Sequence, residues 1–267
     1  QVITVNGADL QLMRGGRAGR PVLLLHEAGG STRTVRMLAE SLAERHEVLA
    51  MDLPGHGESD PQTAPGVSAV AAAADAVIAV LEALRIPPPD VIGIEAGGVV
   101  ALEVASRIPS RLRRVILLDP PACEAELVAA ICAEGLPSMA PDWHGGHLSR
   151  CWHMQRDARL YFPWFRRDPQ GMRAGEPALD DREIQMEVTE RLKSEGAWQL
   201  LLADAVSQDL AAGMAAAAVD VVLACPATSP WRERAVALAA SVGSPFFVLP
   251  TDAVAARAAL AEILGSA

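Results

Sequence analysis

The sequence predicts an α/β fold built on a mostly parallel sheet with helices on both faces. Short apolar runs alternate along the chain with longer stretches of helical periodicity, which is the pattern of strands buried on both faces. The chain has 267 residues, of which 51% are hydrophobic, so it is long enough to bury one large core.

The first half of the chain contains four predicted strands and three predicted helices. The strands are Val22–Leu25, Val48–Met51, Val91–Ile94 and Val115–Leu118. The helices are Ser31–Arg45, Val67–Leu84 and Val99–Arg107. Ser31 or Thr32 is expected to cap the first helix, because a hydroxyl can accept a hydrogen bond from a free amide of the first turn. Pro87, Pro88 and Pro89 end the second helix.

The alternation of strand and helix stops over residues 121–215, which contain helical and irregular stretches but no convincing strand. Val221–Ala224 and Phe246–Leu249 then restore the strands, and Val254–Leu264 is expected to close the chain as a helix. We therefore expect residues 1–120 and 216–267 to form the core and residues 121–215 to form an inserted helical cap.

Composition excludes several classes of partner. The net charge of −10 argues against nucleic acid, because binding phosphates requires a basic face. We expect no membrane partner, since no apolar run reaches the length of a membrane span. The N-terminus lacks the charged-then-apolar pattern of a signal peptide, and a removed leader is left open. Four widely spaced cysteines are expected to be reduced thiols in a cytoplasmic protein. No dinucleotide fingerprint or phosphate loop is present, so no cofactor is expected. The expected partner is a small molecule, and a homodimer is left open.

Three motifs occur in a characteristic order: PVLLLHEAGGS at residues 21–31, MDLPGHGESD at 51–60 and VIGIEAGGVVALEVA at 91–105. Together they resemble the α/β-hydrolase superfamily over nearly the whole chain, most strongly over residues 20–120. The resemblance implies an α/β-hydrolase fold with a cap after the sixth strand. It also implies that the turn after the first buried strand supplies an oxyanion-hole amide and that residues 93–97 form the nucleophile elbow.

The positions of the catalytic triad depart from this resemblance. Glu95 stands where the superfamily has its nucleophilic serine. The stretch Cys225–Pro230, where the acid is usual, contains no carboxylate, and no histidine follows His153. Because a serine hydrolase needs a nucleophile, a base and a group that orients the base, ordinary esterase, lipase or peptidase activity is not expected.

Glu95 is instead predicted to carry protons, with the Ala28 and Ala96 amides as an oxyanion site. This predicts a small-molecule enzyme of lyase, isomerase or cyclase type that acts near a carbonyl. Two alternatives remain open. In the first, Glu95 is inert and the protein is a pseudoenzyme or a ligand-binding protein. In the second, Glu95 is a carboxylate nucleophile in an atypical hydrolase. The missing base would then leave the Glu95 ester unhydrolysed.

Other candidate residues lie beside the oxyanion loop and in the cap. His26 is expected either to support that loop or to pair with Glu95, whereas His56 and Asp119 are interpreted as structural. Tyr161, His147, His144 and His153 are candidates for a second proton carrier, and all three of these histidines fall within the cap.

The cap is rich in aromatic residues. Six of the ten aromatic side chains fall within residues 143–165, and they are Trp143, Trp152, Tyr161, Phe162, Trp164 and Phe165. They are expected to form either an aromatic wall over a substrate pocket or the core of the cap itself.

Two further patterns in the cap carry weaker expectations. His144, His147 and Cys151 lack a fourth ligand, so no metal site is predicted. Five arginines give the cap a basic edge. One of these arginines could hold an anionic substrate, while most are expected to remain solvated. They are Arg150, Arg156, Arg159, Arg166 and Arg167.

Overall fold

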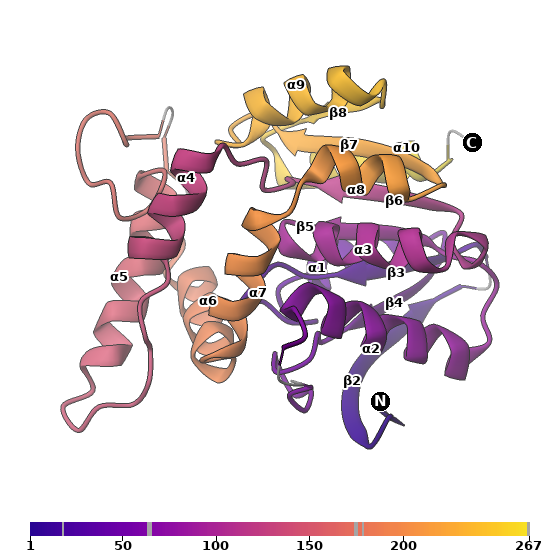
Figure 1. Ribbon diagram of the computed structural model, residues 1–267, viewed down its shortest axis with the longest axis horizontal. Helices are drawn as coiled ribbons and strands as arrows, with labels where there is room; N and C mark the ends of the chain where they lie inside the picture. The colour runs from indigo at the N-terminus through magenta and orange to yellow at the C-terminus, as the bar shows by residue number, and fades with distance from the viewer. Residues whose placement is uncertain (18, 63–65, 174–175, 178, 266–267) are drawn as a thin grey trace.

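The computed structural model describes residues 1–17, 19–62, 66–173, 176–177 and 179–265. Within them, one eight-stranded sheet has the order β1-β2-β4-β3-β5-β6-β7-β8 (Figure 1). The strands are β1 (Val2–Val5), β2 (Ala8–Gly16), β3 (Pro21–Leu25), β4 (Glu47–Met51), β5 (Asp90–Ile94), β6 (Arg114–Leu118), β7 (Asp220–Pro226) and β8 (Phe246–Leu249). Strands β3 to β8 pair in parallel, and only the pairs formed by β2 are antiparallel. The predicted α/β-hydrolase fold is confirmed.

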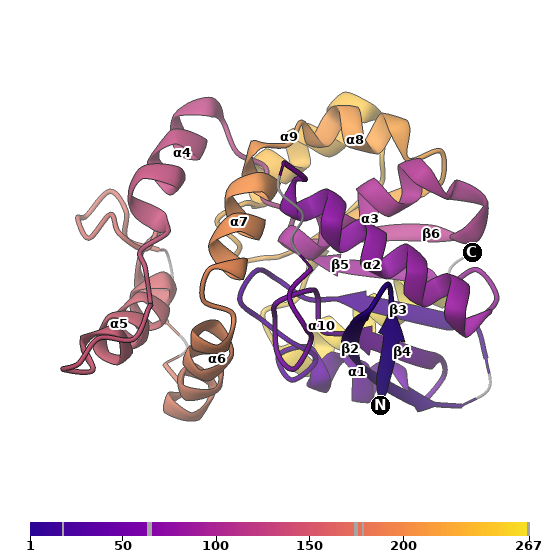
Figure 2. The ribbon, with the colours of Figure 1, turned by 60° about the horizontal axis from the view of Figure 1, so that its bottom comes forward.

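Helices cover both faces of the sheet, as predicted. One face packs against α2 (Ala69–Leu84), α3 (Ala96–Arg107), α8 (Leu210–Ala216) and α9 (Arg232–Val242). The other face packs against α1 (Arg36–Leu42) and α10 (Ala253–Gly265). Figure 2 shows α2, α3 and α8 on the near side of the sheet and α1 and α10 on the far side.

The edge hairpin of β1 and β2 was not predicted. Its strands are partly exposed and do not form an apolar run, and Asn6 and Gly7 make the turn between them with positive φ angles. The central strands were predicted because all or nearly all of their side chains are buried. Every residue of β3, for example, is buried.

Two helix starts differ from the prediction. Helix α1 begins at Arg36 rather than Ser31, and neither Ser31 nor Thr32 caps it, because the position before the helix is Val35. The Thr32 amide instead donates to Asp52 Oδ1 at 2.6 Å, which holds residues 31–34 in a turn. Helix α3 begins at Ala96 rather than Val99, directly after the elbow residue Glu95.

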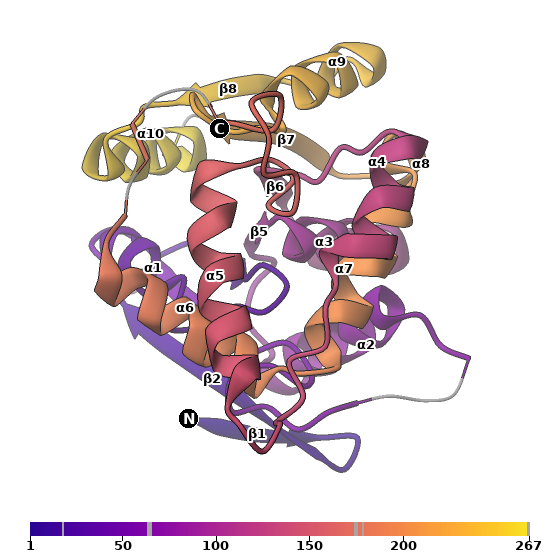
Figure 3. The same cartoon turned by 90° about the vertical axis from the view of Figure 1, so that its left-hand side faces the viewer.

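The region after β6 is helical, as predicted. It contains α4 (Ala125–Ala130), a π-helical turn (Ile131–Gly135), α5 (Gly146–Leu160), α6 (Asp181–Lys193), α7 (Ala197–Ser207) and α8. Figures 1 and 3 show α4, α5 and α6 standing to one side of the sheet. Helices α7 and α8, by contrast, pack against α3. The division of the chain at residues 120 and 216 therefore stays a prediction.

Across the described residues, no helix combines the length and apolar character that crossing a bilayer requires.

Candidate active site

A cavity of about 270 Å³ lies where β5 and β6 end beneath helices α4 to α7. Four charged side chains line it: the carboxylates of Glu95 and Asp119 and the guanidinium groups of Arg173 and Arg191. The aromatic part of its wall consists of Tyr161, Phe162, Trp164, Phe165, Trp198 and Trp231. An apolar cavity with a few polar groups at one end is the usual form of a small-molecule site.

Glu95 occupies a sharp turn between β5 and α3. Its φ of 48° and ψ of −116° are strained for a residue with a side chain, and such strain is often found at functional sites. The turn depends on two glycines of the motif. A Cβ on Gly93 would lie 2.4 Å from the Gly97 carbonyl oxygen, and one on Gly97 would lie 2.4 Å from the Leu25 carbonyl oxygen. The sequence Gly-Ile-Glu-Ala-Gly therefore forms the elbow that the superfamily motif predicts.

The surroundings of Glu95 raise the pKa of its carboxyl to about 7. Burial is the largest cause, because it disfavours the charged form. Nearby Glu27 and Asp119 also raise this pKa, whereas Arg191 and a hydrogen bond from the Ala28 amide lower it. Glu95 can therefore exist in both protonation states near neutral pH.

The loop after β3 holds the predicted oxyanion residue Ala28. His26 supports this loop: its Nδ1 donates to the Glu27 carbonyl oxygen at 2.7 Å, and its Nε2 accepts from the Leu53 amide at 2.9 Å. Both ring nitrogens are thus bonded to the backbone, and His26 presents no free nitrogen to Glu95. The Ala28 amide lies close enough to the Glu95 carboxyl to lower its pKa, so this predicted oxyanion donor faces Glu95.

The other predicted oxyanion donor, Ala96, is the first residue of α3. Amides of the first helical turn have no acceptor within their own helix. The Ala96 amide is therefore placed at the helix end that favours negative charge, beside the Glu95 side chain.

Arg191 on α6 is a site residue that the sequence analysis missed. Its Nη2 donates to the Ala28 carbonyl oxygen at 3.0 Å, and its Cζ lies 4.5 Å from the centre of the Trp198 ring. The side chain also passes over Gly29, where a Cβ would lie 2.8 Å from Cζ. In the sequence, Arg191 sits within the charged run Thr-Glu-Arg-Leu-Lys-Ser-Glu, which has the appearance of a solvated helix face.

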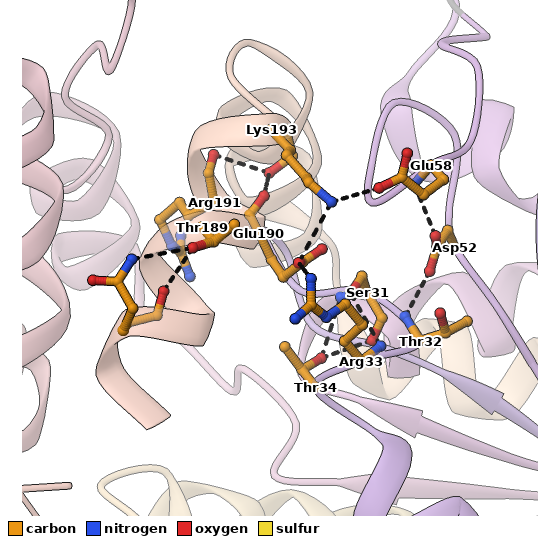
Figure 4. A network of polar contacts seen from close by, with 12 residues as sticks. Ser31, Thr32, Arg33, Thr34, Asp52, Glu58, Thr189, Glu190, Arg191 and Lys193 are labelled. Atoms are coloured by element: carbon orange, nitrogen blue, oxygen red, sulfur yellow. Dashed lines mark hydrogen bonds and ion pairs between the residues drawn. The ribbon is translucent and has the colours of Figure 1, made fainter. Parts of the chain in front are cut away.

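A network of charged side chains fixes α6 against the core (Figure 4). Glu190 is fully buried and lies 3.2 Å from Arg33 Nη1 and 3.7 Å from Lys193 Nζ. Lys193 also pairs with Glu58, whose amide donates to Asp52. Because Glu190 and Lys193 flank Arg191 along the helix, this network helps to position Arg191 over the oxyanion loop.

Asp119 follows β6 and forms a second acidic position of the cavity. Ser229 donates a short hydrogen bond to its Oδ1, and the same hydroxyl accepts from the Trp231 amide at 3.0 Å. Burial raises the pKa of Asp119, whereas Ser229, Cys225 and Arg173 lower it. The sequence analysis interpreted Asp119 as structural, and the structure places it on the cavity wall.

The family model for the α/β-hydrolase fold matches residues 20–218. The chain belongs to the α/β-hydrolase fold family. This match spans the elbow, the oxyanion loop and the helical region after β6.

Several curated relatives of this α/β-hydrolase match a shorter stretch. The chain is 32% identical over 120 residues to the dihydrolipoyllysine-residue acetyltransferase component of the acetoin cleaving system of Cupriavidus necator. This match covers 45% of the chain and 32% of the relative. The chain is 37% identical over 100 residues to a pimeloyl-[acyl-carrier protein] methyl ester esterase of Neisseria meningitidis, covering 38% of this chain and 36% of that enzyme. The matched stretch thus spans about a third of the length of these relatives.

Solved α/β-hydrolase structures match over the full chain at low identity. The enol-lactonase from Burkholderia xenovorans LB400 has a TM-score of 0.68 and 16% identity, covering 100% of this chain and 98% of that one. A thermophilic esterase from Thermogutta terrifontis has a TM-score of 0.68 and 22% identity, with 100% and 97% covered. At this identity the likeness shows the shared fold alone.

The structure divides the predicted cap residues of this α/β-hydrolase into two groups. Tyr161 and Trp164 line the cavity, together with Phe162 and Phe165. Trp152 packs on the internal core of the cap. Trp198 and Trp231 also line the cavity but were missed, because they lie outside the aromatic cluster of residues 143–165.

The remaining cap candidates lie away from the cavity. Trp143 is 94% exposed, and His144 and His153 are exposed as well. His147 Nδ1 accepts from the Asp142 amide at 3.2 Å, in the turn before α5. In the part of the chain that the structure describes, no three His, Cys, Asp or Glu side chains come together as metal ligands.

Proposed function

We propose that this α/β-hydrolase is a small-molecule enzyme that works without a serine nucleophile and uses Glu95 as its acid–base group. The observation that carries this proposal is the position of Glu95 at the nucleophile elbow, facing an aromatic-walled cavity. The reaction is a proton transfer beside a carbonyl group, of lyase, isomerase or cyclase type.

The electrostatics of Glu95 support acid–base chemistry. A proton carrier works best when its pKa lies near the pH at which it operates, and the pKa of Glu95 is raised to about 7. As a base, its carboxylate removes a proton from the carbon beside the carbonyl. The electron pair of the broken C–H bond moves to the carbonyl oxygen, which becomes an enolate.

The Ala28 amide connects this proton transfer to stabilisation of the enolate. Before the reaction it faces the Glu95 carboxylate and favours its charged form. Once Glu95 has taken the proton, the neutral acid is a weaker acceptor, and the amide can donate to the negative oxygen of the substrate instead. The Ala96 amide at the start of α3 provides the second donor. Tyr161 is the predicted second proton carrier that lines the same cavity.

A second candidate function is a binding protein without turnover. The closeness of the Ala28 amide to Glu95 favours it, because the donor that would hold a substrate oxygen faces a carboxylate of the protein itself. In that case Glu95 would be a structural substitute for a bound anion.

We also place the protein in the cytoplasm, with a small molecule as its partner. The support is the chemistry of its cysteines: all four are free, and Cys151 and Cys225 are buried. Reduced thiols of this kind are typical of cytoplasmic proteins.

The experiment that tests this function is hydrogen–deuterium exchange at carbon. A panel of small ketones and 2-oxo acids is incubated with the protein in D₂O, and loss of the C–H signal beside the carbonyl is followed by NMR. At least one compound should exchange, and Glu95→Gln should slow that exchange by about 10²- to 10⁴-fold. Glu44→Gln, at an exposed position after α1, serves as the control and should exchange at the wild-type rate.

Equal exchange rates in wild type and Glu95→Gln would contradict acid–base catalysis. Tight binding of a panel compound without any exchange would favour the binding protein.

A further inference from the structure

Arg191 carries a positive charge at the cavity for which the structure shows no close carboxylate. Among the described residues no carboxylate oxygen lies within 4.0 Å of its guanidinium nitrogens, and its side chain donates a hydrogen bond to the neutral Ala28 carbonyl oxygen. Its Nε is buried without a hydrogen-bond partner in the described part of the chain. The charge of Arg191 lowers the pKa of Glu95 without a direct ion pair, so a ligand anion at hydrogen-bond distance would be favoured beside it.

The second guanidinium of the cavity is already compensated. Arg173 donates to the Ala158 carbonyl oxygen at 2.8 Å and to the Thr228 carbonyl oxygen at 3.2 Å, and its charge is felt by Asp119. This leaves Arg191 as the charged donor with capacity for a ligand.

Trp198 adds a second donor on the same side of the cavity. Its ring lies under the Arg191 guanidinium, and its Nε1 is buried without a hydrogen-bond partner among the described residues. Arg191 Nε and Trp198 Nε1 are therefore two buried N–H donors on stacked side chains, and neither has an acceptor among the described residues. A buried donor that lacks an acceptor costs free energy, which a ligand oxygen can recover.

The rest of the cavity fits an apolar body rather than a second charged group. Phe162 contacts Trp231 edge to face with ring centres 4.6 Å apart, and Trp164 contacts Phe165 in the same way at 5.7 Å. At about 270 Å³ the cavity has room for a small organic molecule.

We propose that the cavity binds a small carboxylate with an apolar or aromatic body, whose carboxylate lies against Arg191 and Trp198. Arg191 presents the planar donor fork that suits a carboxylate, and the aromatic wall holds the body. The inference rests on the proposed function, for which it names the substrate class. The reacting carbonyl then lies between this anion site and the Ala28 and Ala96 amides.

The site also couples anion binding to the protonation of Glu95. Glu95 is surrounded by Arg191 on α6, Glu27 in the loop after β3, Asp119 after β6 and Cys123 before α4. Two further titratable groups feel the charge of Arg191, and both stay neutral: burial lowers the pKa of His56 to about 3 and raises the pKa of Cys151 to about 11. A ligand carboxylate beside Arg191 repels the ionised form of Glu95. The affinity of the protein for the ligand carboxylate should therefore fall as the pH rises through 7.

The test compares two probes of similar shape, 3-phenylpropanoate and 3-phenylpropanamide, by isothermal titration calorimetry at pH 6. Wild type should bind the carboxylate at least about tenfold more tightly than the amide. Arg191→Gln should remove this preference while keeping the affinity for the amide, which also shows that the variant has folded. Arg182→Gln, an exposed arginine at the start of the same helix, should retain the wild-type preference.

Three results would overturn the inference: equal affinity of wild type for both probes, an unchanged preference in Arg191→Gln, or no binding of either probe up to about 10 mM. Failure of the proposed function can be told apart, because probe binding requires no proton transfer. If catalysis fails, the carboxylate preference persists in wild type. In Glu95→Gln the preference for the carboxylate should persist. The affinity for the carboxylate should no longer fall as the pH rises above 7.

Discussion

The environment of Glu95 contains groups that shift its pKa in opposite directions, and the net effect raises it. Burial, Glu27 and Asp119 favour its neutral form, whereas Arg191 and the Ala28 amide favour its charged form. The result is a carboxyl with a pKa of about 7, compared with an ordinary value of 4.5. This balance is the physical basis for assigning Glu95 an acid–base role.

The raised pKa of Glu95 should appear in the stability of the protein as a function of pH. In the unfolded chain Glu95 loses its proton near pH 4.5, but in the folded protein it keeps the proton up to about pH 7. Between these two pH values the unfolded state therefore binds fewer protons than the folded state. The contribution of Glu95 to stability is complete below pH 4.5 and falls as the pH rises. The loss amounts to about 3 kcal/mol by pH 8.

Glu95→Gln removes this titration. Its free energy of unfolding relative to wild type should therefore increase from pH 5 to pH 8, by up to about 3 kcal/mol in urea denaturation experiments. The exposed variant Glu44→Gln provides the baseline. A difference between Glu95→Gln and wild type that is independent of pH would contradict the raised pKa.

The sequence predicted some residues of the site and not others. Glu95, Ala28 and Ala96 could be placed because a short motif determines a local turn, and Gly93 and Gly97 fix that turn by close contacts. Arg191 could not be placed, because its role depends on how α6 packs over the oxyanion loop. No feature of the neighbouring sequence distinguishes it from a solvated arginine.

At the scale of elements, α6 connects the helical region to the core through the buried carboxylate of Glu190. Its two cationic partners come from different sides: Arg33 from the turn before α1, and Lys193 from α6 itself. Arg33 is 60% exposed, so water screens part of this interaction.

Glu190→Gln tests this connection. The variant keeps the shape of the side chain but removes the charge that faces Arg33 and Lys193, and we expect a loss of about 2 kcal/mol of stability. Urea denaturation should show this loss, while Glu183→Gln, more exposed on the same helix, should lie within about 0.5 kcal/mol of wild type. Equal stability of Glu190→Gln and wild type would mean that packing alone holds α6 in place.

The predicted strands are the segments with continuous apolar runs, including β8, where Phe247 and Val248 are exposed. Strands such as β3 and β6 were found because continuous apolar runs mark strands covered on both faces. The partly exposed hairpin of β1 and β2 gave no such run. The start of α1 was placed too early because the Thr32 amide bonds to Asp52, a contact between segments 20 residues apart that local capping rules do not contain.

At the scale of the whole molecule, the cavity lies where the carboxyl ends of the sheet strands meet the segments that follow β6. The carboxyl ends of β5 and β6 supply Glu95 and Asp119. The region after β6 supplies Arg191 from α6, Trp198 from α7 and four further aromatic side chains from the segment that follows α5. Its helices have a core of their own around Cys151, Met154 and Trp198. The sheet thus positions the two acids, and under the proposal the region after β6 selects the ligand.

The measurement that tests the central claim most directly is a titration of the glutamate carboxyl carbons by ¹³C NMR. Wild type should show one glutamate that titrates near pH 7, and this signal should be absent from Glu95→Gln. Saturation with 3-phenylpropanoate should move its midpoint to higher pH. If every glutamate titrates near its ordinary value, Glu95 is not a poised acid and the proposed chemistry is wrong.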